Sequence, residues 1–215
     1  MIEFYGPSEA RMKKRRGHVM GYDIRNAFQN LARYNERANR EMYAVLSQLT
    51  EKARKRDVSS WFGSIHGILN HILITDMNWL KRYRALSPAS PVLTDPQLDP
   101  PNLSWSHDLH EDFEGLRQTR VFVDAKIRAW FAEFPISRGS EEFQYRDSRG
   151  TLRRAVAGAA FEFLFLHQTH HRGQISQILD TLGLPNNFAD NAAYLEGPEI
   201  RPVIGSPRGA DPVSI

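Results

Sequence analysis

Apolar side chains recur every three or four residues along four long stretches of the chain, the spacing that places them on one face of an α-helix. In the first stretch the apolar positions begin at Ile24 and end at Leu49, with charged side chains between them. Ser64 is a suitable N-cap for the second helix, and Gly183 with Pro185 marks the end of the fourth. Helices are therefore predicted over residues 24–49, 65–84, 109–131 and 156–182.

The connections between these helices carry turn-forming residues. Five prolines within 86–106 stop the second helix and predict a long Pro-rich loop that wraps over one end of the helices and forms part of a pocket wall. Partial alternation over 143–154, around a polar Asp-Ser-Arg-Gly turn, predicts a small β-hairpin before the fourth helix. Four amphipathic helices joined in this way predict an all-α fold, a four-helix bundle.

Composition and charge fit one globular domain, which we place over residues 22–195. The chain has 215 residues and 41% hydrophobic content, enough for a core. Residues 1–21 are predicted to be a disordered basic leader, and 196–215 a Pro/Gly-rich tail. The first 19 residues carry five basic and two acidic side chains, so they account for the whole net charge of +3. The folded body is therefore neutral, and no nucleic-acid partner is expected.

The absence of cysteine narrows the chemistry. It excludes disulfides, thiolate zinc sites and cysteine nucleophiles, so any metal site has to use histidine and carboxylate ligands. No apolar run is long enough to span a bilayer, and no signal-peptide pattern opens the chain. We expect no membrane association and a cytoplasmic location.

Three histidines stand close together in the fourth predicted helix. His167 and His171 are four residues apart, which places both rings on one face, a turn apart. His170 lies three residues after His167, a spacing that also allows two rings to chelate one ion. Spacing alone therefore does not decide between His170 and His171 as the partner of His167. The apolar stripe that runs through His167 and His171 favours this pair. Gln174 lies about a turn further along and is expected to hold a ligand ring or a bound water.

The second predicted helix offers a third ligand. His66 and His71 are five residues apart, about 140° around a helix, so they cannot both face one core. His71 is flanked by apolar residues, whereas His66 lies in the first turn, where we expect it to be exposed. We therefore select His71 as the third candidate ligand. His107 and His110 are expected to be solvated or capping, and His18 lies in the leader.

Three neutral imidazoles without a thiolate suit Zn²⁺ or Ni²⁺, and three protein ligands leave a position for water or substrate. The alternative to a metal site is the common case in which a histidine on an apolar face is only a packed or surface residue. Spacing does not decide between a metal site and this alternative. Asp76 lies on a different face from His71. A surface or interhelix ion pair is its expected role.

Three stretches together resemble the DinB-like (damage-inducible, YfiT-like) family of four-helix-bundle metalloenzymes. The resemblance covers about residues 22–195, and Glu36-Arg37 departs from it where an aromatic residue is common. The stretches are Leu31-Ala32-Arg33-Tyr34-Asn35 with Ala38-Asn39, Phe62-Gly63-Ser64-Ile65-His66-Gly67-Ile68-Leu69-Asn70-His71 with Asp76 and Trp79-Leu80, and His167-Gln168-Thr169-His170-His171-Arg172-Gly173-Gln174 with Leu182-Gly183.

The resemblance implies a metal held by His71, His167 and His171. It also implies Zn²⁺ or Ni²⁺, homodimers, and relatives that act as thiol-dependent S-transferases or isomerases with a low-molecular-weight thiol. The leading hypothesis is a metal-dependent enzyme, an S-transferase or hydrolase, with an open three-histidine site and a small-molecule substrate. The alternative is a non-catalytic metal-binding stress-response protein. A third hypothesis is a helical interaction module in which the histidine cluster is incidental.

Overall fold

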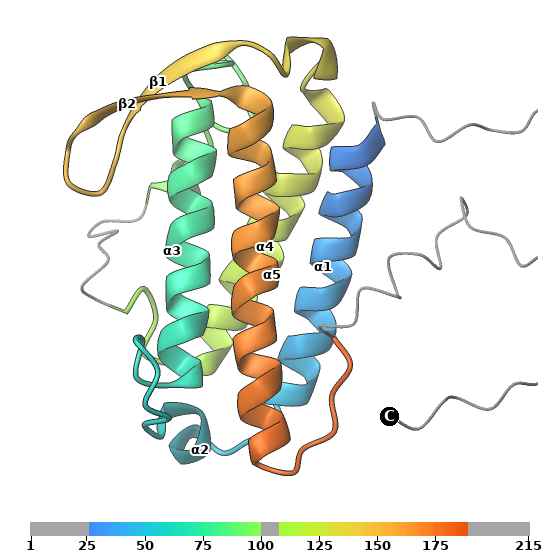
Figure 1. The fold of residues 1–215 in the computed structure, drawn as a ribbon, viewed down its shortest axis with the longest axis vertical. Helices are drawn as coiled ribbons and strands as arrows, with labels where there is room; N and C mark the ends of the chain where they lie inside the picture. Colours follow the sequence, from blue (N-terminus) through green and yellow to red (C-terminus); the bar gives the residue numbers. More distant parts are fainter. Residues whose placement is uncertain (1–25, 100–107, 189–215) are drawn as a thin grey trace, which may run out of the picture.

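The computed structural model describes residues 26–99 and 108–188, and helices dominate this part of the chain. Three short helices and a two-stranded hairpin connect four long helices (Figure 1). The long helices are α1 (Ala27–Leu46), α3 (Ile65–Tyr83), α4 (Phe113–Glu133) and α5 (Ala157–Thr181). The short elements are α2 (Glu51–Lys55), the 3₁₀ helices η2 (Pro96–Leu98) and η3 (Ile136–Arg138), and the strands β1 (Glu142–Arg146) and β2 (Leu152–Val156).

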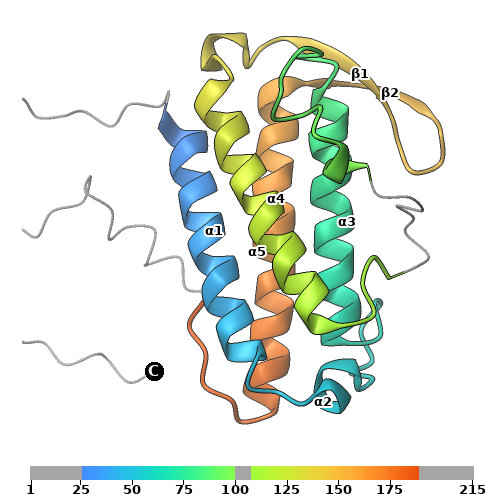
Figure 2. The ribbon, with the colours of Figure 1, turned by 180° about the vertical axis from the view of Figure 1, so that it is seen from behind.

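The four long helices lie side by side, with α5 and α4 on opposite sides and α1 and α3 between them (Figures 1 and 2). Each of α1 and α3 contacts both α4 and α5. The predicted all-α class is confirmed. Within the described residues, the β-structure consists of the small two-stranded hairpin. No helix in the described ranges is both long enough and apolar enough to cross a membrane.

The direction of the helices explains the long Pro-rich loop. α3 and α4 run the same way, so the chain after α3 has to return along the length of the helices before α4 begins (Figure 1). The described part of the loop is anchored by Leu93 and Leu98, which are fully buried in the core. Asp95 also pairs with Lys126 of α4 at 2.6 Å. The loop therefore does more than cover one end of the helices.

Helix ends differ from the predictions where a local cap decides the boundary. α4 begins at Phe113 rather than at 109, because the Asp112 carboxylate accepts a 2.7 Å hydrogen bond from the Gly115 N–H. Similarly, Thr50 caps the short helix α2, which the charged sequence had not predicted. The Ser64 cap of α3 is confirmed, since its hydroxyl accepts from the Gly67 N–H at 3.1 Å.

The hairpin is confirmed, and its antiparallel register places Phe143 opposite Ala155. Phe143 is buried and contributes to the core beneath the hairpin. The leader at 1–21 and the tail at 196–215 lie outside the described residues, and the domain limits 22 and 195 stay predictions.

A set of buried polar side chains crosses the centre of the helices. Arg120 of α4 donates to Asp76 of α3 at 2.5 Å and to Asp124 of its own helix at 2.8 Å. Burial alone would lower the pKa of Arg120, but the two carboxylates, Asp124 first, raise it, so the guanidinium stays charged. A surface or interhelix ion pair was expected for Asp76. The structure shows an interhelix pair with Arg120, and Asp76 is completely buried in it.

The same polar set continues to α1 and α5. Asn39 donates to Asp124 at 3.0 Å and to Gln168 at 3.0 Å. Arg172 donates to Asn35 at 2.5 Å and to Asn39 at 3.2 Å. Each of the four long helices thus contributes at least one member to a set that we call the central polar cluster. Its members are Asn35, Asn39, Asp76, Arg120, Asp124, Gln168 and Arg172.

Removing the guanidinium of this cluster is predicted to destabilise the fold strongly. Arg120→Met leaves two buried carboxylates without their cation, which costs about 3–5 kcal/mol in comparable buried pairs. Chemical denaturation measures the free energy of unfolding. The matched control is Arg117→Met, one turn earlier on α4, where Arg117 is half-exposed and pairs with Glu114 of the same helix. Equal effects of the two substitutions would contradict the assigned role of Arg120.

Candidate metal centre

Three imidazole rings converge between α3 and α5. The Nε2 atom of His167 lies 3.0 Å from Nε2 of His71 and 3.1 Å from Nε2 of His171. One ligand nitrogen from each ring lies within 4.8 Å of the other two. The structure thus brings together the three histidines chosen from the sequence, two from one helix and one from its neighbour.

Local sequence holds each ring in place. His71 lies one turn and a half into α3, and Phe62, just before that helix, stacks on its ring at 4.0 Å between centroids. Phe163, one turn before His167 on α5, stacks on the His167 ring at 5.7 Å. The two aromatic side chains restrict how far the imidazoles can turn.

Gly67 permits the stacking of Phe62 on His71. A Cβ atom at position 67 would lie 2.1 Å from the backbone oxygen of Phe62, which is far inside any allowed contact. A side chain there would force the Phe62 segment away from the first turn of α3. Because the glycine and the aromatic residue act through the folded backbone, sequence spacing alone gave no reason to select either of them.

Gln174 fixes the tautomer of one ring. Its Oε1 lies 2.7 Å from Nδ1 of His171. Because a side-chain carbonyl only accepts hydrogen bonds, Nδ1 of His171 carries the proton and Nε2 presents a lone pair to the other two rings. Gln174 thus contacts the His171 ring, and its role beside a bound metal ion stays a prediction.

The surroundings keep the rings uncharged. Burial, with a smaller contribution from His171, lowers the pKa of His71 to about 4. Burial and the neighbouring imidazoles lower the pKa of His167 to about 3. Burial also lowers the pKa of His171, partly offset by its bond with Gln174. Neutral imidazole is the form that binds a metal ion, so the rings are in the ligating state at neutral pH.

These donors fit a borderline divalent ion. Where two Nε2 atoms lie this close, at most one of them carries a proton. The other nitrogen then directs an unprotonated lone pair at its neighbour. Nδ1 of His167 is buried and has no hydrogen-bond partner in the described part of the chain. A cation among the three Nε2 atoms would use all three lone pairs. Imidazole-only sites suit Zn²⁺ and Ni²⁺.

The remaining histidines lie elsewhere. His170 is exposed, and its ring lies beside that of His171 with 4.9 Å between centroids, so it borders the cluster without joining it. His110 is half-buried and bonds to Thr119 through Nε2 at 2.7 Å. His18 and His107 lie outside the described residues.

The prediction that His66 is exposed was wrong. Its side chain is 2% exposed, and Nε2 donates to the backbone oxygen of His110 at 2.9 Å. Asn70, one turn later, donates to the same oxygen and accepts from the His110 N–H. The segment before α4 therefore folds over the first turn of α3. Periodicity within one helix does not reveal such a covering segment.

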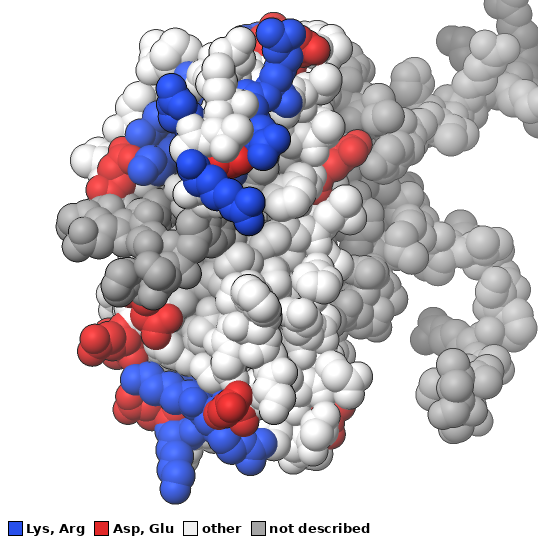
Figure 3. Space-filling view, turned by 60° about the vertical axis from the view of Figure 1, so that its left-hand side comes forward, with Lys and Arg blue, Asp and Glu red and all other residues white. Residues whose placement is uncertain are grey.

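The outer surface beside the imidazoles carries exposed apolar side chains. Trp61 is 94% exposed next to Phe62, and Phe163 and Leu166 of α5 are also exposed. Figure 3 shows that charged side chains gather at both ends of this face, whereas its middle has few of them.

Comparison with known proteins agrees with the motifs. The model of the DinB family matches residues 22–201. The chain is 21% identical to "Protein DinB" of Bacillus subtilis (strain 168) over 167 residues, which cover 77% of this chain and 91% of that protein. No solved structure matches the chain significantly. Because the family model spans most of the sequence, the chain belongs to the DinB family.

Proposed function

We propose that the chain is a metal-dependent enzyme whose ion is held by His71, His167 and His171. The observation that carries this proposal is the convergence of three neutral Nε2 atoms from two neighbouring helices. The contacts of α1 and α3 with both α4 and α5 support a four-helix bundle as the scaffold. Zn²⁺ or Ni²⁺ is the proposed ion.

Each residue of the centre has a distinct role in this proposal. The three imidazoles bind the ion, Gln174 holds the proton on Nδ1 of His171, and Phe62 keeps the His71 ring in place. Such an ion lowers the pKa of a bound water or thiol and so supplies a nucleophile at neutral pH. Because the chain has no cysteine, any thiol at the site comes from a small molecule.

We further propose an S-transferase or hydrolase reaction, in keeping with the resemblance noted above. The exposed side chain of Phe163, which stacks on the His167 ring, and the exposed Trp61, next in sequence to Phe62, favour a small-molecule substrate with an apolar part. The homodimer and the cytoplasmic location stay predictions.

A non-catalytic metal-binding protein is the second candidate. Phe62 and Phe163, which lie against the imidazoles, supply no group that transfers a proton. A panel of thiols and electrophiles separates the two candidates, because the enzyme turns over at least one pair in a metal-dependent manner. A blank panel from protein with bound metal favours the second candidate.

Removal of a ligand is predicted to abolish metal binding. Tag-free wild-type protein should contain about one metal ion per chain by elemental analysis, and His71→Ala or His171→Ala should contain less than a tenth of that. Two imidazoles remain in each variant, and they hold borderline ions far more weakly than three.

The matched control is His170→Ala, which removes an exposed imidazole directly beside His171. It should keep the wild-type metal content. Metal-poor wild-type protein after reconstitution, or equal losses in all three variants, would contradict the proposed site.

Loss of the Gln174 contact is predicted to weaken binding without abolishing it. Gln174→Leu removes the acceptor from Nδ1 of His171, and comparable changes to the partner of a ligating histidine cost about 10–100-fold in metal affinity. Competition with a chromophoric chelator measures the affinity. Gln177→Leu, an exposed glutamine on α5, is the control and should bind as the wild type does. Unchanged affinity in Gln174→Leu would rule out this role.

The metal-free protein is predicted to lose stability as the pH falls from about 6.5 to about 4. Unfolded histidine takes up a proton near pH 6.5, whereas His71 and His167 in the fold have pKa values of about 4 and about 3. In this interval the unfolded state binds more protons, so the free energy of unfolding decreases on acidification. His167→Gln should take up about one proton fewer on unfolding at pH 5, measured from denaturation curves across pH. An identical pH dependence in the variant would contradict neutral burial of His167.

A further inference from the structure

One strip of α3 reaches solvent, and it joins the candidate metal centre to the hairpin. Most of the 19 residues of this helix are buried, and the partly exposed ones are Gly67, His71, Asn78, Lys81 and Arg82. At about 100° per residue, these positions fall within roughly 100° of one another around the helix. A molecule that binds against α3 from outside therefore meets His71 near one end of the strip and two cations at the other.

A row of aromatic rings follows the same path. Phe163 of α5 stacks on the His167 ring. The centroid of the Trp79 ring lies 5.2 Å from that of Phe163 and 5.2 Å from that of Tyr145 in β1. The guanidinium carbon of Arg82 lies 4.7 Å from the centroid of Trp79 and 4.9 Å from that of Tyr145. An apolar floor thus leads from one imidazole of the candidate centre to a cation.

Arg82 has no acidic partner. Its half-buried side chain forms no ion pair and no hydrogen bond with a described residue, and none of its nitrogen atoms is sealed from solvent. Burial lowers the pKa of Arg82, although Tyr145 and then Asp147 oppose this shift. Asp147 itself pairs with Arg153 at 2.9 Å. A partly desolvated guanidinium without a carboxylate is costly, and a bound anion would remove that cost.

The cavity beside Arg82 is lined by cations. It lies between α3 and β1 and has a volume of about 310 Å³. Its lining includes Lys81, Arg82 and Arg146 but no acidic residue. Lys81 already pairs with Asp99 at 2.9 Å, whereas Arg146 forms no ion pair with a described residue and donates to the Gly150 backbone oxygen at 2.8 Å. Figure 3 shows Lys and Arg side chains at this end of the face. The cavity therefore favours an anionic group.

We propose that the substrate of the metal-dependent reaction is an elongated small molecule with a terminal carboxylate, which Arg82 and Arg146 bind. A guanidinium offers paired N–H donors in one plane, which match the two oxygens of a carboxylate. The apolar body of the substrate lies along Phe163, and its reactive group lies at the three imidazoles. The Arg82 guanidinium lies over Trp79, eight residues after His71, so the two ends are about 12 Å apart along the helix axis. This inference rests on the proposed function, because the reactive end needs the metal ion.

Hydroxamates with and without a carboxylate at the far end test this substrate class. The hydroxamate group chelates a divalent ion through two oxygen atoms. The monohydroxamate of sebacic acid carries a carboxylate on a chain that is about long enough to reach Arg82, and decanohydroxamate has the same length but ends in a methyl group. In calorimetric titration of the metal-loaded full chain, the sebacic probe should bind at least about tenfold more tightly, the difference that one bond to a charged group supplies. The monohydroxamate of succinic acid is too short and should gain nothing over butanohydroxamate.

Metal content, measured on the same sample, separates the two ways in which this experiment can fail. Protein that retains no metal after reconstitution overturns the proposed function and this inference with it. Metal-loaded protein that binds the sebacic probe and decanohydroxamate equally, or binds neither, overturns this inference alone. An equal gain for the short succinic probe would place the carboxylate near the ion rather than at Arg82 and would also overturn it.

Arg82→Gln tests the cation directly. It should remove the tenfold advantage of the sebacic probe and leave decanohydroxamate binding and metal content unchanged. The matched control is Arg149→Gln, which removes the same charge from an exposed position in the turn of the hairpin, outside the cavity. Equal effects of the two substitutions would show a general effect of charge and overturn the assignment.

An exposed variant covers the case in which Arg82→Gln does not fold. Arg146 is exposed on β1, so Arg146→Gln removes a cation of the cavity without disturbing the core. It should weaken binding of the sebacic probe several-fold and leave decanohydroxamate unaffected. Wild-type affinity for the sebacic probe in this variant would contradict the proposed carboxylate site.

Discussion

Arg120, held between Asp76 and Asp124, is the interaction on which the arrangement of the four long helices depends most. It joins α4 to α3, and Asn39, Gln168 and Arg172 extend the contacts to α1 and α5. A helix that turned or slid would leave a buried charge without its partner, which is far more costly than the loss of an apolar contact. The central polar cluster therefore fixes how the helices face one another.

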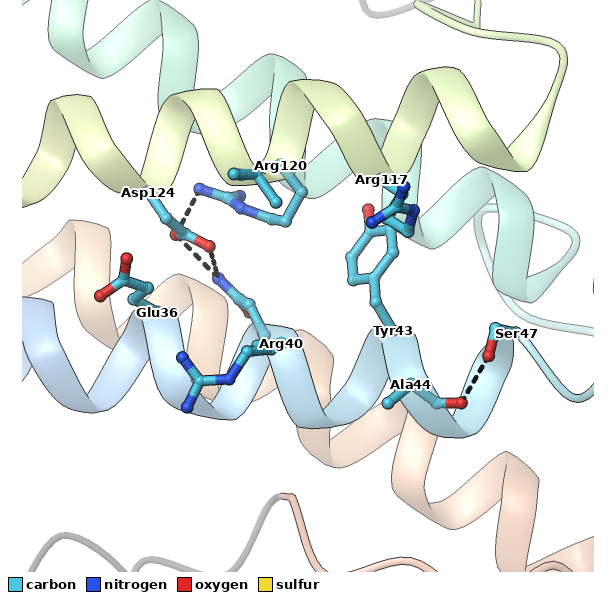
Figure 4. A pocket seen from close by; sticks show the side chains of 10 residues that line it. Glu36, Arg40, Tyr43, Ala44, Ser47, Arg117, Arg120 and Asp124 are labelled. Atoms are coloured by element: carbon cyan, nitrogen blue, oxygen red, sulfur yellow. Dashed lines mark hydrogen bonds and ion pairs between the residues drawn. The ribbon is translucent and has the colours of Figure 1, made fainter.

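The candidate metal centre depends on the same constraint. Gln168 and Arg172 follow His167 and His171 directly in α5, so the residues that anchor this helix to the core also set the direction of the two imidazoles. Three members of the same cluster, Asn39, Arg120 and Asp124, also line a cavity between α1 and α4 (Figure 4).

Much of the fold and of the histidine cluster could be predicted from the sequence, because both depend on spacing within single helices. His71, His167 and His171 were selected by helical periodicity and by their apolar neighbours, and the structure brings them together. What spacing could not supply were the contacts between distant segments. The covering of His66 by the backbone of His110 and the stacking of Phe62 on His71 both depend on how separate elements meet.

The central claim is that one divalent ion is bound by three imidazoles from α3 and α5. Crystals of the protein grown with Zn²⁺, with diffraction data collected on both sides of the zinc absorption edge, test it most directly. The account predicts one strong anomalous peak about 2.0–2.1 Å from each Nε2 atom of His71, His167 and His171. A peak held by His170 instead, or no peak between α3 and α5, would contradict it.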